Sequence, residues 1–402
     1  MATLLLVIIY LAFISLGLPD SLLGVAWPVM QSDFEAPLET AGLLFMTIAG
    51  CTIISSLASG KVLKKFGTGK VTFVSTLMTA GALLGFYFSP SVIWLFLCAI
   101  PLGLGAGAID AGLNDYVATH YKAHHMSWLH CFWGVGATLG PVLMAQFISG
   151  QNSWSSGYLM IAGIQFLLVI ILLFALPLWK KVTTTSNLSL NEELDDSESV
   201  IHKEEPKHIR PLQIKGVKLA MISFLFYCAV ESSVGLWGSS YLVNIKDLSA
   251  SVAAQWVSLY YGGITVGRFI TGFITFKMSN RTLIRMGQLI ALAGAILLIL
   301  PLPSIVSLIG FVMVGLGLAP IFPCMLHETP TRFGKSHSQT IMGYQMAVAY
   351  TGSTFIPPLL GFIASHSTIG IFPFCVVVFA LAMLLGSEKL NSLLKKRQLI
   401  SA

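Results

Sequence analysis

The sequence predicts an all-α membrane protein with twelve transmembrane helices arranged as two six-helix pseudo-repeats. Three observations predict this fold. The 402 residues are 55% hydrophobic and only 10% charged, whereas soluble domains are about a quarter charged. Apolar runs long enough to cross about 30 Å of hydrocarbon recur along the whole chain. Glycine, proline and acidic positions of the first half return in the second half at a nearly constant offset.

The apolar runs form two sets of six on either side of one polar segment. The predicted spans of the first set are 3–30, 38–60, 69–89, 91–118, 127–149 and 157–179. Those of the second set are 216–243, 250–277, 282–300, 303–328, 337–365 and 367–387. The first run lacks a preceding basic region and a small-residue cleavage site, so we interpret it as a retained span rather than a signal peptide.

The polar segment divides the chain into three parts. We predict an N-terminal half at 1–179, a cytoplasmic linker at 180–215 and a C-terminal half at 216–402. The linker is rich in Ser, Thr, Asn and acidic residues and has no apolar run. Such a composition is typical of a flexible or partly helical connection.

The basic residues predict the orientation of the chain. With a cytoplasmic N-terminus, the inner loops and tails hold 21 of the 23 Lys and Arg, and the outer loops hold only Lys246. Cytoplasmic loops of membrane proteins carry this excess. We therefore expect a multi-pass protein of the plasma membrane with both termini in the cytoplasm, and the basic charge indicates topology rather than nucleic-acid binding.

The two halves share a pattern of small and acidic residues. An offset near 212 relates each pair, as expected of parallel repeats with a substrate site between the halves near the midplane. The pairs are Gly50 and Gly262, Gly60 and Gly272, Gly103 and Gly315, Gly105 and Gly317, Asp20 and Glu231, Gly136 and Gly352, and Pro141 and Pro357.

Charged residues inside spans point to the functional site, because inserting each charged side chain at the bilayer centre costs at least about 2.5–3.5 kcal/mol of free energy. Asp20 follows Pro19, which bends the first span, and Trp27 lies two turns away on the same face. A carboxylate and an aromatic ring on one face suit a sugar, which bonds through its hydroxyls and stacks its C–H face. A purely structural pairing of Asp20 is the alternative.

Further acids and one arginine extend this set. Asp110 and Asn114 are four residues apart and point the same way, and a buried carboxylate can exchange a proton near neutral pH. We predict proton coupling at Asp20, Asp110 and Glu231. Glu231 is also a candidate for substrate binding or for an ion pair with Arg268, and we expect Arg268 to hold an inner gate.

Aromatic and polar residues complete the predicted substrate site. His130 and Trp133 are three residues apart on one helix, and a packing role for His130 is the alternative. The predicted substrate-binding residues are Asp20, Trp27, Asn114, His130, Trp133, Glu231, Trp237 and Gln345. The six cysteines show no metal-ligand spacing, and the sequence has no nucleotide-binding loop. We expect no cofactor, no metal and no enzymatic activity.

Three stretches resemble a known family. The loop 60–70 resembles the signature loop of the major facilitator superfamily, except that Lys64 stands where an acid is expected; we assign gating roles to Lys64 and Lys65. The stretches 107–114 and 128–141 resemble the fucose permease branch, the sugar–proton symporters. This resemblance implies alternating access, with Asp20 and Asp110 serving proton coupling and sugar binding, and His130 and Trp133 beside the cavity.

Three functions are consistent with these residues. A proton-coupled symporter of a small polar solute, most simply a sugar, accounts for the acids and aromatics together. A proton-antiport exporter of drugs or amphipathic metabolites would use the same acids in a cavity lined by apolar side chains. A lipid-handling or sensor protein would use the scaffold without transporting a soluble solute. The expected partners are the solute, protons and membrane lipids, without nucleic acid, and we expect a monomer.

Overall fold

The computed structural model describes residues 2–121, 123–149, 153–194, 211–275 and 277–401, and within these ranges it holds helices and no strand. The helices of the N-terminal half are α1 (Ala2–Asp20), α2 (Leu22–Asp33), α3 (Glu39–Phe66), α4 (Thr68–Tyr87), α5 (Val92–His120), α6 (Ala123–Ile148) and α7 (Trp154–Leu194). Those that follow are η1 (Pro211–Gln213), α8 (Val217–Asn244), α9 (Ala250–Ile274), α10 (Asn280–Ile299), α11 (Ser304–Leu318), α12 (Ile321–His327), α13 (Thr329–Phe333), α14 (Lys335–Ser365), η2 (Ile369–Ile371) and α15 (Phe372–Ser401).

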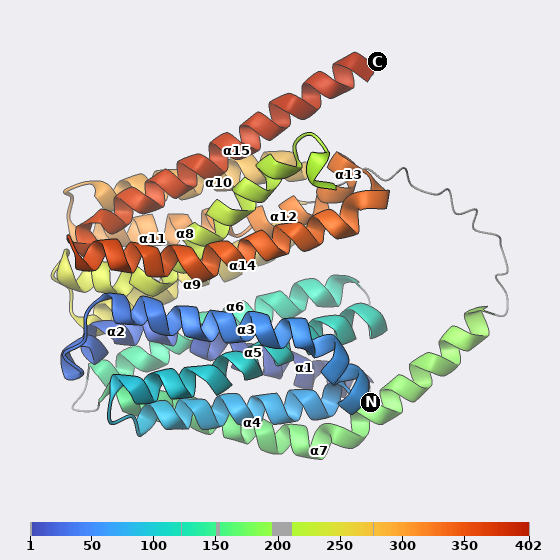
Figure 1. Cartoon of the computed structure of the whole chain (residues 1–402), viewed down its shortest axis with the longest axis horizontal. Helices are drawn as coiled ribbons and strands as arrows, with labels where there is room; N and C mark the ends of the chain where they lie inside the picture. The colour runs from blue at the N-terminus through green and yellow to red at the C-terminus, as the bar shows by residue number, and fades with distance from the viewer. Residues whose placement is uncertain (1, 122, 150–152, 195–210, 276, 402) are drawn as a thin grey trace.

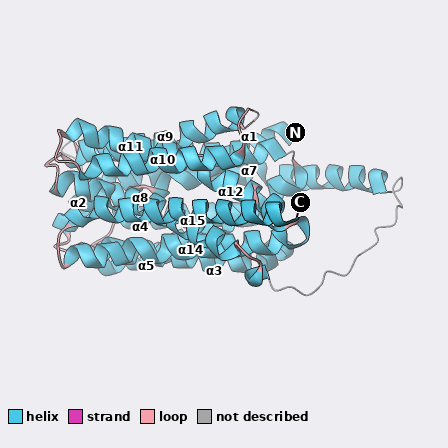
Figure 2. Ribbon diagram, turned by 90° about the horizontal axis from the view of Figure 1, so that it is seen from above, coloured by secondary structure: helices cyan, strands magenta, loops and turns pink. Residues whose placement is uncertain are grey.

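The helices satisfy the length and apolarity that membrane spans require. Eleven spans in the described residues qualify, and three of them, Thr3–Asp33, Ser304–His327 and Ile369–Lys395, each join a pair of consecutive helices. The remaining described helix of spanning length is α9, which is 25 residues long and carries Arg268. With α9 the chain has the twelve spans that the sequence predicts. Figures 1 and 2 show these helices running side by side along the long axis, with both chain ends at the same end of the bundle.

The spans form two halves that pack in the same way (Figure 1). On α5, a side chain at Gly103 would collide with the backbone oxygen of Ile48 on α3. On α11, a side chain at Gly315 would collide with the backbone oxygen of Tyr260 on α9. Both glycines and both partners are 212 residues apart, so the sequence repeat is also a repeat of helix contacts. Small residues allow such close backbone approach in membrane bundles.

Pro19 in α1 and Pro141 in α6 each free a backbone carbonyl, and a side chain from a neighbouring helix bonds to it. Pro19 cannot bond the carbonyl of Ser15, four residues earlier, and Gln165 on α7 donates to that carbonyl at 2.8 Å. Pro141 likewise frees the carbonyl of Ala137, and Ser21 donates its hydroxyl to it at 3.0 Å. The helix therefore breaks between α1 and α2 at Ser21, directly after Asp20.

The halves meet tightly at one end of the bundle. A single hydrophobic cluster there joins residues of both halves, including the fully buried Trp27 and Trp237. Gly42 at the start of α3 lies against Pro358 of α14, and the Ser251 hydroxyl donates to the backbone oxygen of Ala145 across α9 and α6 at 3.0 Å. This end carries the short connections after α2, α8 and α14, and we call it the closed end.

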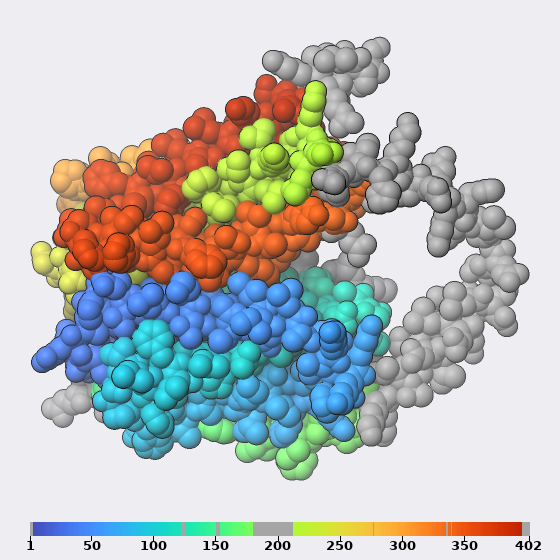
Figure 3. All heavy atoms as spheres, viewed as in Figure 1, coloured from blue at the N-terminus to red at the C-terminus, as the bar shows by residue number. Residues whose placement is uncertain are grey.

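The halves separate at the opposite end, which carries the chain termini and is called the open end. Two separate hydrophobic clusters lie there, one in each half. A side chain at Gly50 or Gly60 on α3, or at Gly343 on α14, would meet nothing within 4 Å. Figure 3 shows a hollow between the halves at this end. The central space of the bundle is therefore accessible from the open end.

The predicted division between the halves falls partly outside the described residues. Helix α7 continues past the predicted end of its span at 179 and ends at Leu194. The described chain resumes at Pro211 in η1, and α8 begins at Val217. The division into 1–179, 180–215 and 216–402 stays a prediction, with the first part of the segment helical.

Candidate functional site

Asp20 lies at the kink between α1 and α2 and faces the central space. Its side chain is exposed, although Leu18 and Leu22 beside it in the chain are 3% and 1% exposed. The Trp133 indole on α6 donates a hydrogen bond from Nε1 to the Asp20 Oδ2 at 2.7 Å. Among the described residues no Lys, Arg or His forms an ion pair with Asp20. Asp20 is thus a water-accessible carboxylate without a cation partner.

Asp110 on α5 supplies a second carboxylate on the same side of the cavity. Asn114, one turn later, donates from Nδ2 both to the Asp110 Oδ1 and to the Asp110 backbone oxygen, each at 2.9 Å. Asp110 lies within electrostatic reach of Asp20 and of Tyr350 on α14 of the other half. The structure therefore brings the two predicted acids of the N-terminal half to one cavity.

The C-terminal half contributes an ion pair. Arg268 on α9 donates from Nη2 to the Glu231 Oε1 on α8 at 3.2 Å and to the Tyr227 hydroxyl at 3.4 Å. The Glu231 backbone oxygen accepts a hydrogen bond from the Tyr260 hydroxyl at 3.1 Å. The side chains of Arg268 and Glu231 are 15% and 20% exposed. Glu231 is therefore compensated in a way that Asp20 is not.

Trp133 and His130 border both groups from α6. The Arg268 Cζ lies 5.4 Å from the centre of the Trp133 ring, a cation–π distance. His130 has an exposed side chain, packs edge-on against Phe13 at 6.1 Å between ring centres and lies within electrostatic reach of Arg268. The predicted residues Asp20, Asp110, Asn114, His130, Trp133, Glu231 and Arg268 thus gather around one cavity between the halves.

Other predicted site residues lie elsewhere. Trp27 and Trp237 are fully buried in the closed end, where the Trp237 Nε1 donates to the backbone oxygen of Pro357 at 2.8 Å. Gln345 is 2% exposed, and its Oε1 accepts a hydrogen bond from Thr329 at 2.9 Å. None of the three faces the cavity in this state. Their assignment to solute binding therefore depends on a rearrangement of the halves.

The predicted gating lysines lie at the open end. Lys64 and Lys65 occupy the last turn of α3, and the Lys65 Nζ stands 5.3 Å from the centre of the Phe66 ring. Neither lysine forms an ion pair with a described residue. This agrees with the absence of an acid at position 64 in the loop signature.

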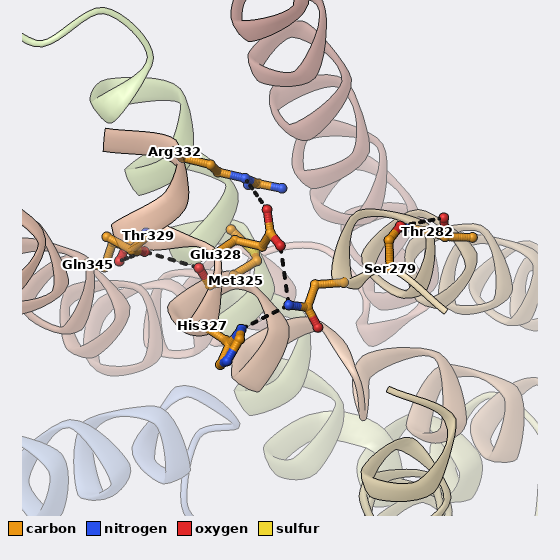
Figure 4. A network of polar contacts seen from close by, with 9 residues as sticks. Ser279, Thr282, Met325, His327, Glu328, Thr329, Arg332 and Gln345 are labelled. Atoms are coloured by element: carbon orange, nitrogen blue, oxygen red, sulfur yellow. Dashed lines mark hydrogen bonds and ion pairs between the residues drawn. The ribbon is translucent and has the colours of Figure 1, made fainter. Parts of the chain in front are cut away.

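Sequence reasoning missed a polar network at the open end of the C-terminal half (Figure 4). Arg332 donates from Nε to the Glu328 Oε2 at 3.3 Å, and Asn280 donates from Nδ2 to the Glu328 Oε1 at 3.2 Å. The same Asn280 nitrogen lies 2.9 Å from the His327 Nδ1. Burial lowers the pKa of Arg332, and Glu328 opposes that effect. The network fixes α12 and α13 to the start of α10.

Comparison with known proteins identifies the family. The model of the Major Facilitator Superfamily matches residues 9–355, which is most of the chain. The chain belongs to the Major Facilitator Superfamily. The members of this superfamily are transporters and not enzymes, which confirms the predicted fold class and the prediction of no enzymatic activity.

Three similar proteins illustrate the breadth of this Major Facilitator Superfamily relationship. Bypass of stop codon protein 6 of Saccharomyces cerevisiae is 24% identical over 89% of this chain and 76% of its own. The glucose/mannose transporter GlcP of Bacillus subtilis is 23% identical over 92% of this chain and 91% of its own. The inward open conformation of the xylose transporter XylE from E. coli superposes with a TM-score of 0.77 at 12% identity, covering 97% of this chain and 96% of that one.

Proposed function

We propose that this superfamily member imports a neutral sugar together with a proton by alternating access. The single observation that carries the proposal is Asp20, a carboxylate that faces the central cavity and has no cation partner among the described residues. An ionisable group at this depth in a membrane bundle marks a solute or ion pathway. Asp20 is the proton carrier in this mechanism.

The surroundings of the acids favour Asp20 over Glu231 for this role. Arg268 neutralises Glu231 at 3.2 Å, so adding a proton to Glu231 would leave Arg268 uncompensated. Among the described residues, the group that bonds to the Asp20 carboxylate is the neutral N–H of Trp133. Protonation of Asp20 therefore removes a negative charge without leaving a positive charge uncompensated. Asp110 lies close enough to act as an alternative proton site.

The charge of the cavity favours a neutral solute. Three carboxylates, Asp20, Asp110 and Glu231, share the cavity with one guanidinium, Arg268. This excess of negative charge repels an anionic solute. Hydroxyl groups can donate to the carboxylates, and His130 has an exposed ring available to a polar solute. The likeness to a glucose/mannose transporter supports a hexose, without naming which one.

The excess of basic residues supports an orientation of the chain in the membrane. The open end carries the chain termini and the basic loops, so the positive-inside rule places it in the cytoplasm. The structure then corresponds to an inward-facing state. A solute and a proton that bound from outside would leave through the open end, after the halves rock about the central site.

The test is sugar-induced proton movement in proteoliposomes. D-glucose, D-mannose, D-galactose and L-fucose are added to vesicles of the wild type, of Asp20→Asn and of the control Asp115→Asn, whose exposed side chain lies near the open end of α5. We expect one sugar to alkalinise the outside with the wild type and with the control. Asp20→Asn should lose this signal while retaining exchange of labelled sugar across the membrane.

Two results would contradict the proposal. Proton movement that survives in Asp20→Asn would remove Asp20 from the coupling mechanism. Silence across the whole panel, with protein shown to be folded by size-exclusion chromatography, would exclude the tested hexoses as substrates and direct attention to export of an amphipathic compound.

A further inference from the structure

Trp133 contacts a charged group from each half through a different part of its ring system. The indole Nε1 donates to the Asp20 Oδ2 at 2.7 Å within the N-terminal half. The face of the same indole lies 5.4 Å from the Arg268 Cζ of the C-terminal half. Arg268 in turn pairs with Glu231 at 3.2 Å. One side chain therefore lies between the unpaired acid and the ion pair.

The two contacts of Trp133 depend on each other electrostatically. A hydrogen bond from N–H to an anion is stronger than one to a neutral acceptor. It also pushes electron density toward the ring, and the ring face attracts a cation through its negative potential. An ionised Asp20 therefore strengthens the attraction between Trp133 and Arg268. A protonated Asp20 weakens both contacts together.

Trp133 stands beside the closest contact between the halves along α6 and α9. Gly134, the next residue, lies against the side chain of Thr265. The Thr138 and Thr265 hydroxyls are 3.4 Å apart, and the Ser258 hydroxyl donates to the Thr138 backbone oxygen at 2.8 Å. We call this contact the α6–α9 seam. A change in the position of the indole acts directly on a seam that alternating access must open and close.

We propose that Trp133 is a positioning residue that couples the charge of Asp20 to the closure of the α6–α9 seam. An ionised Asp20 holds the indole against Arg268 and keeps the seam closed as observed. Proton binding at Asp20 releases the indole and loosens the seam. The inference rests on the proposed function only in taking Asp20 as the group that binds the proton.

Other ionisable groups around this link need to be separated from Asp20. Those that face Asp20 are Asp110 on α5 and Tyr261 on α9. Those that face Arg268 among the described residues are Tyr227, Cys228 and Glu231 on α8, Tyr260 on α9, and His130 and Cys131 on α6. The variant Asp20→Asn isolates the contribution of Asp20, because it fixes that residue neutral and leaves all the others in place.

The test measures the seam directly and needs no sugar. Cysteines replace Thr138 and Thr265 in the full chain, and their cross-linking by a short thiol-specific reagent is followed between pH 5 and pH 8. The single-cysteine replacements report the background from the native thiols. The pair is placed in the wild type, in Trp133→Phe, which keeps a ring but removes the N–H, and in Asp20→Asn. Trp128→Phe is the control, since Trp128 lies on the same helix and contacts Phe269 with its ring.

The yields are compared between backgrounds at each pH, so the pH dependence of thiol reactivity cancels. At pH 8 we expect the wild type and Trp128→Phe to cross-link about two- to fivefold more than Trp133→Phe and Asp20→Asn do, which is the factor that a cation–π contact supplies. At pH 5, where Asp20 is protonated in the wild type, all four backgrounds should cross-link to the same extent. A pH response that persists in Trp133→Phe, or a wild type without any response, would overturn the inference.

The outcome is independent of whether a sugar is the substrate. A pH-dependent seam in vesicles that show no sugar-induced proton movement would leave the coupling by Trp133 intact and contradict the proposed solute. Sugar-driven proton uptake together with a seam whose cross-linking is insensitive to Trp133→Phe would support the proposed solute and contradict the coupling by Trp133. Thermal unfolding of each variant shows that it is folded before it is cross-linked.

Discussion

Arg268 and Glu231 form an ion pair of 3.2 Å in the C-terminal half that the N-terminal half does not repeat. The repeat relates Glu231 to Asp20 and Arg268 to Ser56. Ser56 donates its hydroxyl to the backbone oxygen of Gly107 at 3.2 Å and carries no charge. The same fold therefore holds a compensated acid in one half and an uncompensated acid in the other. This asymmetry separates a structural role for Glu231 from a proton-carrying role for Asp20.

Removal of one partner of this pair should cost more than removal of both. We expect Glu231→Gln to destabilise the protein by about 1–3 kcal/mol, since it leaves Arg268 uncompensated in a largely buried place. The double variant Glu231→Gln/Arg268→Gln should recover part of that loss. Thermal unfolding in detergent measures both. Additive losses in the double variant would mean that the two side chains do not stabilise each other.

The repeated glycine contacts predict a pair of matched substitutions. Gly103→Ala should collide with the Ile48 backbone on α3, and Gly315→Ala should collide with the Tyr260 backbone on α9. Overpacking of this kind costs about 1–3 kcal/mol, so we expect both variants to unfold at lower temperature by similar amounts. Gly50→Ala is the control because a side chain there meets nothing within 4 Å. An unchanged melting temperature for Gly103→Ala would show that α3 and α5 can separate.

The sequence predicted the spans and the repeat well because both follow from local rules. Apolar length sets the spans, and the glycine offset identifies contacts between helices that are equivalent in the two halves. The breaks inside two spans were less visible. Pro19 suggested the break after Asp20. The side chains that bond to the freed carbonyls of Ser15 and Ala137 are those of Gln165 and Ser21, and each is more than a hundred positions from the carbonyl it bonds.

The geometry of the candidate site was predicted only where it follows from spacing along a single helix. Spacing along a helix correctly grouped Asp110 with Asn114, because both lie on one face of α5. It could not show that Trp133 bonds to Asp20, since that contact joins residues 113 positions apart. The positions of Trp27 and Trp237 in the same predicted spans as Asp20 and Glu231 suggested a cavity, whereas tertiary packing buries both.

Two ion pairs at the open end should respond differently to loss of the acid. Glu328→Gln removes the partner of Arg332, whose side chain is 8% exposed, and also changes the acceptor of Asn280. We expect a loss of about 1–3 kcal/mol in stability. Glu388→Gln removes the partner of Arg285, whose side chain is 48% exposed, and should cost less than about 1 kcal/mol. Thermal unfolding compares them, and equal losses would show that burial does not determine the contribution of these pairs.

The predicted orientation can be tested at two exposed loops. Asp247 lies in the connection between α8 and α9 at the closed end, and Lys65 lies at the end of α3 at the open end. A membrane-impermeant maleimide added to intact cells should label a cysteine at Asp247 and leave one at Lys65 unlabelled, because the basic residues keep the open end in the cytoplasm. Labelling of the unsubstituted chain, which has no added cysteine, corrects for the native thiols. Permeabilised cells should label both positions. Labelling of Lys65→Cys alone in intact cells would reverse the topology, and the observed state would then be outward-facing.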